Sequence, residues 1–137
     1  MRILGIDYGQ KRIGLALSDP RGIIAQPHGF MDNDRGFHAK LLKLLQDQEV
    51  SEIVVGLPRS MDGSSSPMTK EVEGFAERLR TAVPVPVHLC DERLTSAQAE
   101  RTLLEGDVRR AKRKVSRDAI AAALLLQSFL KDRPPCA

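Results

Sequence analysis

The first quarter of the chain alternates short apolar runs with turn residues, a pattern that predicts three strands in succession. We expect these strands over residues 2–7, 12–18 and 23–30, with turns at 8–11 and 19–22 between them. Pro27 has no N–H to donate to a sheet ladder, so the third strand should lie at a sheet edge. The opening therefore predicts an antiparallel three-stranded meander.

Helical and strand-like patterns alternate in the rest of the chain. Apolar residues at helical spacing predict helices over 35–48, from 67 to about 79, and from 95 to about 105. Short apolar runs predict strands at 53–55, ended by a turn at 56–58, and at 85–90. From Asp118 onward the sequence is apolar on every side, which predicts a helix buried against the sheet. The segment at about 132–137 contains two prolines and is expected to be a flexible tail.

This order of elements predicts one α/β domain over residues 1–137, with a mixed five-stranded sheet. The first, fourth and fifth strands should be parallel, so their carboxyl ends should share the edge where open α/β sheets place their sites. Asp7 and the pair Asp91 and Glu92 would then lie together at that edge. Asp19 follows a strand that runs the other way, about 20 Å from Asp7, and is expected to stabilise a turn.

Composition narrows the class of protein further. A chain of 137 residues with 42% hydrophobic and 28% charged residues suits a single folded domain and argues against disorder. No apolar run approaches the roughly 20 residues that span a bilayer, and no signal-peptide pattern is present, so we expect a cytoplasmic protein with no membrane partner. His88 and Cys90 would share a strand face, but without a second ligand pair they do not indicate zinc.

The positive charge is concentrated in one segment. The chain has 21 basic and 18 acidic residues, and six of the basic residues fall within 109–117, where there is no acid. This basic run could hold the backbone of a nucleic acid, or it could be an ordinary solvated loop. One Tyr, four Phe and no Trp argue against an aromatic platform for single strands and favour recognition of backbone or shape. The run consists of Arg109, Arg110, Lys112, Arg113, Lys114 and Arg117.

Carboxylates gathered at one edge, without a histidine or cysteine cluster, favour Mg²⁺ or Mn²⁺. Two such ions about 4 Å apart can promote an in-line displacement at phosphorus. Each acid also has a structural alternative: Asp7 could pair with Lys11 or Arg12, and Asp118 could serve only the dipole of its helix. Periodicity alone does not choose between Asp91 and Glu92.

Four motifs in order resemble the YqgF/RuvX family. They are Gly-Ile-Asp-Tyr-Gly at 5–9 with Lys-Arg-Ile-Gly-Leu-Ala at 11–16, Val-Val-Gly-Leu-Pro at 54–58 with Met-Asp-Gly at 61–63, Asp-Glu-Arg-Leu-Thr at 91–95, and Asp118 with Ala-Ala at 121–122 and Leu-Gln at 126–127. The resemblance implies a three-layer α/β/α fold of the ribonuclease H type, related to Holliday-junction resolvases. It also implies a bacterial nuclease that matures the 5′ end of precursor 16S ribosomal RNA, with junction resolution as a further activity. The family's catalytic, metal-binding triad would fall on Asp7, Glu92 and Asp118. The serines at 64–66 and the Ser-Arg pair at 116–117 depart from the family pattern.

The sequence thus favours a nuclease that uses Mg²⁺ or Mn²⁺, with two ions expected. Its partners would be structured precursor rRNA, ribosomal particles and branched DNA. The predicted contacts to substrate are Lys11, Arg12, Arg109, Arg110, Lys112, Arg113 and Lys114. One alternative is a non-catalytic nucleic-acid-binding factor in ribosome assembly, which would work in chelator. Another is a small nucleotide-binding domain that uses turns at Gly9 and Gly56, although the chain has no convincing P-loop.

Overall fold

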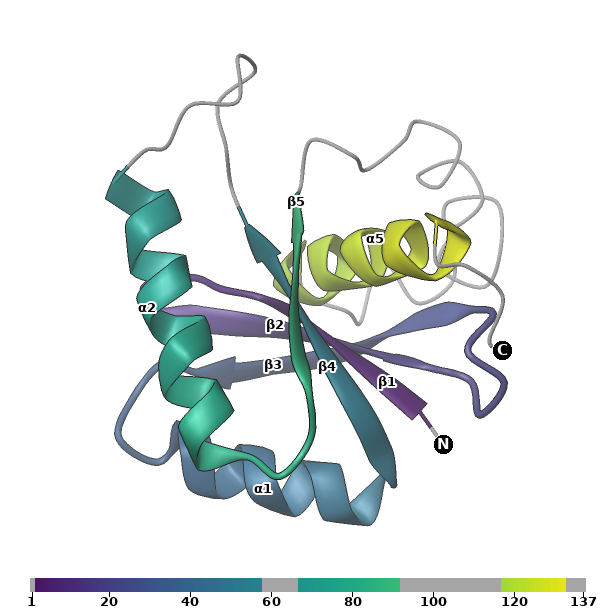
Figure 1. Ribbon diagram of the computed structural model, residues 1–137, viewed down its shortest axis with the longest axis horizontal. Helices are drawn as coiled ribbons and strands as arrows, with labels where there is room; N and C mark the ends of the chain where they lie inside the picture. Colours follow the sequence, from purple (N-terminus) through teal and green to yellow (C-terminus); the bar gives the residue numbers. More distant parts are fainter. Residues whose placement is uncertain (1, 58–66, 92–116, 133–137) are drawn as a thin grey trace.

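A mixed five-stranded sheet in the order β3-β2-β1-β4-β5 forms the centre of the fold (Figure 1). The structure is a computed structural model that describes residues 2–57, 67–91 and 117–132. β2 pairs with β1 and β3 in antiparallel fashion, whereas β4 pairs with β1 and β5 in parallel. This arrangement confirms the predicted sheet and the edge position of the strand that contains Pro27. The strands are β1 (Arg2–Asp7), β2 (Arg12–Ser18), β3 (Ala25–Asp32), β4 (Val50–Leu57) and β5 (Val87–Asp91).

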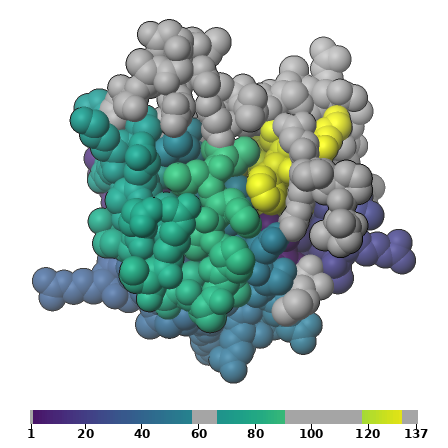
Figure 2. All heavy atoms as spheres, in the orientation of Figure 1, coloured from purple at the N-terminus to yellow at the C-terminus, as the bar shows by residue number. Residues whose placement is uncertain are grey.

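Helices cover both faces of the sheet, which gives three layers (Figure 1). α1 (Phe37–Asp47) and α2 (Pro67–Ala82) bury their apolar stripes in one core, which also holds Leu4 and Ile6 of β1. α5 (Arg117–Asp132) buries Ala122, Ala123 and Leu126 in a second core against the opposite face. Figure 2 shows α2 and β5 side by side on one surface of the molecule, with α5 beyond β5. None of the helices within the described ranges is long and apolar enough to cross a membrane.

Small residues let α5 lie unusually close to the sheet. A Cβ added at Gly5 of β1 would lie 2.8 Å from the Cβ of Leu126 and 3.1 Å from the carbonyl oxygen of Ala122. Real Cβ atoms essentially never approach other atoms closer than 3.0 Å. Glycine in the strand is therefore required by this helix–sheet contact, as expected where backbones approach closely.

The third strand begins two residues later than predicted because Asp19 organises the turn before it. One carboxylate oxygen of Asp19 accepts hydrogen bonds from the backbone N–H groups of Ile23 and Ile24, at 2.6 and 2.9 Å. These two donors are used in the turn, so the β3 pairing starts at Ala25. The predicted role of Asp19 as a turn residue is confirmed.

The fourth strand is longer than predicted. Gly56 and Leu57, expected in a turn, continue β4 and pair with Cys90 and Asp91 of β5. The prediction of a turn at 56–57 was therefore wrong, because pairing with a neighbouring strand extends β4 past its glycine. The predicted helix at 95–105, the basic run at 109–114 and most of the tail lie outside the described residues.

Two other element starts moved for local reasons. The fifth strand begins at Val87 rather than at residue 85, since Pro86 has no N–H to donate to a ladder. The first helix begins at Phe37 rather than at residue 35, because Asp34 accepts a hydrogen bond from the N–H of Gly36 at 2.9 Å and holds a turn there.

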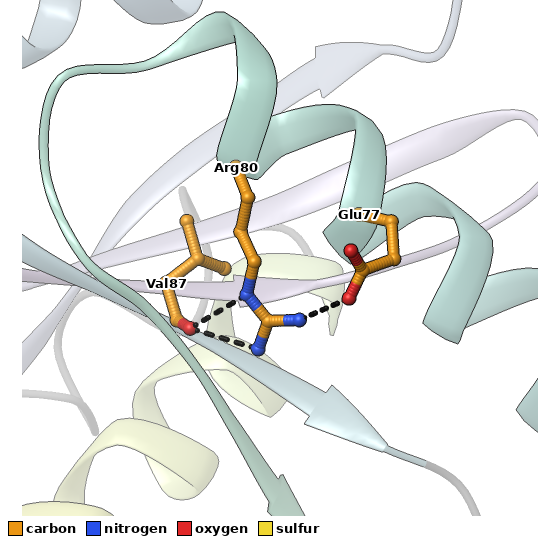
Figure 3. Close-up of polar contacts among 3 residues, drawn as sticks. All are labelled: Glu77, Arg80 and Val87. Carbon is orange, nitrogen blue, oxygen red and sulfur yellow. Dashed lines mark hydrogen bonds and ion pairs between the residues drawn. The ribbon is translucent and has the colours of Figure 1, made fainter.

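The side chain of Arg80 connects α2 to the edge strand β5 through hydrogen bonds to the backbone (Figure 3). The Nε and Nη2 atoms of Arg80 both donate to the carbonyl oxygen of Val87, at 3.3 and 3.0 Å, and Nη1 pairs with Glu77. The carbonyl of Pro86 accepts from Ile53 of β4, so the next carbonyl along, that of Val87, points toward the open edge. Arg80 thus occupies an acceptor that would otherwise be available at the exposed edge of the sheet.

Candidate active site

The strand directions bring the predicted acidic positions to one edge of the sheet. Because β1, β4 and β5 are parallel, their last residues, Asp7, Leu57 and Asp91, lie at the same edge. α5 begins on the side of the sheet opposite α1 and α2, and its first turn contains Asp118.

Strand alternation assigns Asp7 to the α5 side of the sheet. Ile3 of β1 belongs to the core beneath α5, whereas Leu4 and Ile6 belong to the core beneath α1 and α2. Successive side chains of a strand point to opposite faces, so Asp7 shares the face of Ile3 and Gly5. Asp7 is half-buried there.

Gly14 leaves room for Asp118 to lie close to Asp7. Gly14 of β2 lies directly opposite Asp7, and a Cβ added to it would lie 2.0 Å from the carbonyl oxygen of Asp118 and 2.9 Å from its Cβ. Directly opposed residues of an antiparallel pair have Cβ atoms about 4.5–5.5 Å apart, so the Cβ atoms of Asp7 and Asp118 lie within about 8 Å of each other. Two carboxylates from opposite ends of the chain therefore converge on one side of the sheet edge.

Arg12 forms an ion pair with one of these two carboxylates. Its Nε lies 3.6 Å from Oδ2 of Asp118, and the two side chains are 56% and 34% exposed. The sequence offered Arg12 as a partner for Asp7, and the structure places it beside Asp118. At this exposure solvent screens the ion pair, so it contributes little to stability and Arg12 can also contact an incoming anion. Lys11, next to it in the turn, is exposed.

A set of contacts anchors the turn that follows β1. The hydroxyl of Tyr8 donates to Glu71 of α2 at 3.1 Å, and its ring packs on Phe75 with centroids 4.7 Å apart. The amide of Asn33 donates to the carbonyl of Gly9 at 2.8 Å, and a Cβ at Gly9 would lie 2.3 Å from the carbonyl oxygen of Arg12. Sequence reasoning missed Glu71 and Asn33, since neither belongs to a motif and both act across long separations in the chain.

The third predicted carboxylate, Glu92, and the predicted basic contacts at 109–114 lie outside the described residues. Within the described ranges no group of three or more His, Cys, Asp or Glu side chains is placed to hold a metal ion. His88 stacks on Phe129 with centroids 5.8 Å apart and lies 3.8 Å from Glu52. It therefore packs α5 against β5, where the two elements adjoin in Figure 2.

The sheet order and the three layers define a ribonuclease H-like fold. Two solved structures share this fold over almost their whole length. RuvC of Thermus thermophilus in complex with a Holliday junction substrate is 18% identical, with a TM-score of 0.58 and 96% of each chain covered. The Holliday junction resolvase of fowlpox virus is 14% identical, with a TM-score of 0.57 and coverage of 97% of this chain and 100% of that one.

The sequence comparison identifies the family within this class. The family description "RuvX: Holliday junction resolvase" matches residues 1–132, and the chain belongs to this family. The "Putative pre-16S rRNA nuclease" of Dictyoglomus turgidum is 46% identical over 132 residues, covering 95% of this chain and 94% of the relative. The protein of the same name in Syntrophomonas wolfei is 45% identical over 133 residues, with coverage of 95% and 94%. The resemblance drawn from the four motifs is confirmed.

Proposed function

We propose that this protein is a divalent-metal-dependent nuclease that hydrolyses phosphodiester bonds in structured RNA. The proposed substrate is the 5′ end of precursor 16S rRNA within ribosomal particles in the cytoplasm, with branched DNA as a second substrate class. The carrying observation is the convergence of Asp7 and Asp118 at the carboxyl edge of the sheet, made possible by Gly14. The names of the relatives support the choice of RNA, and the resolvase fold supports an activity on branched nucleic acid.

The proposed metal ligands are Asp7, Glu92 and Asp118, and the metal is Mg²⁺ or Mn²⁺ at two positions. The described donors fit such an ion, because carboxylate oxygens are the ligands that these hard cations prefer. When bound, two ions activate a water molecule and stabilise the leaving oxygen. The choice of Glu92 over Asp91 follows the family resemblance of the motif Asp-Glu-Arg-Leu-Thr at 91–95.

The chain's own cations have a separate task in this proposal. Arg12 holds the carboxylate of Asp118 and, being exposed, contacts a phosphate of the substrate together with Lys11. Five residues of the basic run add salt-sensitive contacts to the backbone: Arg109, Arg110, Lys112, Arg113 and Lys114. These contacts position the strand, and the expected products carry a 5′ phosphate and a 3′ hydroxyl.

Replacing Asp7 by Asn tests the proposal. The change removes one negative charge from the metal site and keeps nearly the same shape, so cleavage should fall to background while the melting temperature changes little. Cleavage of a precursor rRNA fragment, linear DNA and a four-way junction should be compared with Mg²⁺, with Mn²⁺ and with chelator. Asp19→Asn is the matched control, since Asp19 lies in the turn after β2, away from the site, and should retain full activity. Wild-type rates in Asp7→Asn would refute the catalytic assignment.

The competing function is a non-catalytic factor that binds nucleic acid during ribosome assembly. It predicts binding that is unchanged in chelator and no cleavage of any of the three substrates with either metal. The metal comparison therefore separates the two functions directly.

A further inference from the structure

Phe30 is an exposed aromatic side chain in the same cross-strand row as the acidic site. Within the described ranges four large hydrophobic side chains are strongly exposed, and Phe30, at 43%, is the one in this row. Phe30 of β3 pairs with Gly14 of β2, and Gly14 pairs with Asp7 of β1. Directly paired residues share a face, so Phe30 lies on the α5 side, two strands away from Asp7.

Arg12 links Phe30 to the carboxylates. Its guanidinium carbon lies 5.1 Å from the centroid of the Phe30 ring, and its Nε lies 3.6 Å from Asp118. The cation lies over the ring in a cation–π contact, and Phe30 as a whole stays 43% exposed. Phe30, Arg12 and Asp118 therefore form a continuous surface that runs from the edge strand β3 to the proposed metal site.

The charges around this surface select the kind of group that can bind on the ring. Asp32 lies opposite Arg12 in the strand pairing, and Asp118 forms an ion pair with the same arginine. The Phe30 ring itself offers a phosphate no hydrogen-bond donor, so a phosphate would be contacted by Arg12, whereas an uncharged aromatic group can stack on the ring. A nucleobase has such a face, and bases of every sequence stack on aromatic side chains.

Distance relates this position to the scissile bond. Two strand spacings of about 4.8 Å separate Phe30 from Asp7, which gives about 10 Å. A helical strand advances about 3.4 Å per nucleotide, so the ring would reach a base within about three nucleotides of the scissile phosphate.

We infer that Phe30, held by Arg12, is a stacking site for one unpaired base of the substrate strand, close to the point of cleavage. This inference rests on the proposed function and adds a substrate class to it, namely a strand with an unpaired segment next to a duplex. Few aromatic residues argue against an extended stacking platform. A single ring suffices for one base and would fix the position of the strand relative to the carboxylates.

The test compares binding to two RNA probes in the full-length Asp7→Asn chain with Mg²⁺, which should bind without cleaving. One probe is a duplex with a short single-stranded extension, and the other is the same duplex with blunt ends. Phe30→Ala should weaken binding to the extended probe about 5- to 150-fold and binding to the blunt probe less than about 2-fold. Phe30→Tyr should restore binding to the extended probe. Leu42→Ala, at a similarly exposed residue of α1, is the control and should bind like the parent chain.

Abasic substitution identifies the stacked base. In the chain that keeps Phe30, removing the base at one position of the extension should weaken binding as much as Phe30→Ala does. In the Phe30→Ala chain, removing the same base should not weaken binding further. Three results would overturn the inference. Phe30→Ala could bind the extended probe as tightly as the parent chain, it could lose the same affinity for both probes, or Phe30→Leu could bind the extended probe as tightly as the parent chain. Cleavage by Asp7→Asn would instead count against the catalytic proposal, and the effect of Phe30 on binding could still be compared in chelator.

Discussion

The contact between Gly14 and Asp118 makes a sharp prediction, because it concerns a residue that carries no chemistry of its own. In Gly14→Ala the new methyl group would lie 2.0 Å from the carbonyl oxygen of Asp118, where ordinary contacts are 3.4–4 Å. The obstructing atom belongs to the backbone, so it cannot rotate away. The start of α5 must retreat by about 1.4 Å, and Asp118 must move with it.

This displacement should harm activity more than stability. A misplacement of about 1 Å in a catalytic group can reduce the rate about 100-fold. Overpacking of this kind costs about 1–3 kcal/mol, or roughly 4–12 °C in melting temperature for a domain of this size. Since domains are typically stable by about 5–15 kcal/mol, Gly14→Ala should remain folded at 25 °C.

The assay measures kcat for metal-dependent cleavage, Mn²⁺ affinity by calorimetry, and melting temperature. Gly74→Ala in α2 is the control, because its methyl group would make only an ordinary contact, 3.6 Å from Arg78, and alanine favours the helix. Gly5→Ala should also destabilise the packing of α5 but reduce kcat less, since it presses on Ala122 and Leu126 rather than on Asp118. Wild-type kcat and Mn²⁺ affinity in Gly14→Ala would refute the proposed role of this contact.

Two further predictions concern stability alone. Arg80→Lys cannot keep both hydrogen bonds to Val87, so it should lower the free energy of unfolding by about 1 kcal/mol in denaturant melts without changing cleavage. The control Arg78→Lys should change neither stability nor cleavage. Equal losses of stability in the two variants would contradict the proposed role of the Arg80 hydrogen bonds. Burial raises the pKa of Asp19, but hydrogen bonds from the backbone of Ile24, Ile23 and Arg21 together lower it below the ordinary 3.8. The stability that Asp19 contributes is therefore present above pH 3.8 and lost as the pH falls through the lower pKa of the folded state. The difference in melting temperature between wild type and Asp19→Asn should shrink in strong acid, and a difference that grows there would show the sign to be wrong.

Local pattern was sufficient to predict β1 and β2 with their observed ends, because an apolar run and a turn define each of them. It failed where a partner decides the boundary. β4 continues through Gly56 because β5 pairs with it, and β3 starts late because Asp19 captures two N–H groups. Strand pairing depends on residues distant in sequence, and the hydrogen bonds to Asp19 depend on a single side chain. Neither effect leaves a trace in the hydrophobic periodicity.

The candidate site, too, was predictable only in part. Parallel strand directions predicted that Asp7 would lie at the carboxyl edge, and the buried helix predicted that α5 would cover the sheet. Nothing in the pattern singled out Gly14, since a glycine in a strand can indicate a bulge, a bend or a close contact. Its meaning is visible only when the backbone of Asp118 is seen beside it.

The position of Asp118 also depends on contacts further along α5. There the side chain of Gln127 accepts from the N–H of Ala25 and donates to the carbonyl of Ile23, both at 3.0 Å. Gln127 lies nine positions after Asp118 in the helix, a distance of about 14 Å. A helix is stiff along its axis, so this fork, together with the contact at Gly5, fixes the register in which Asp118 meets Gly14. The geometry of the proposed metal site is thus set partly by hydrogen bonds in a turn at the opposite end of the strands.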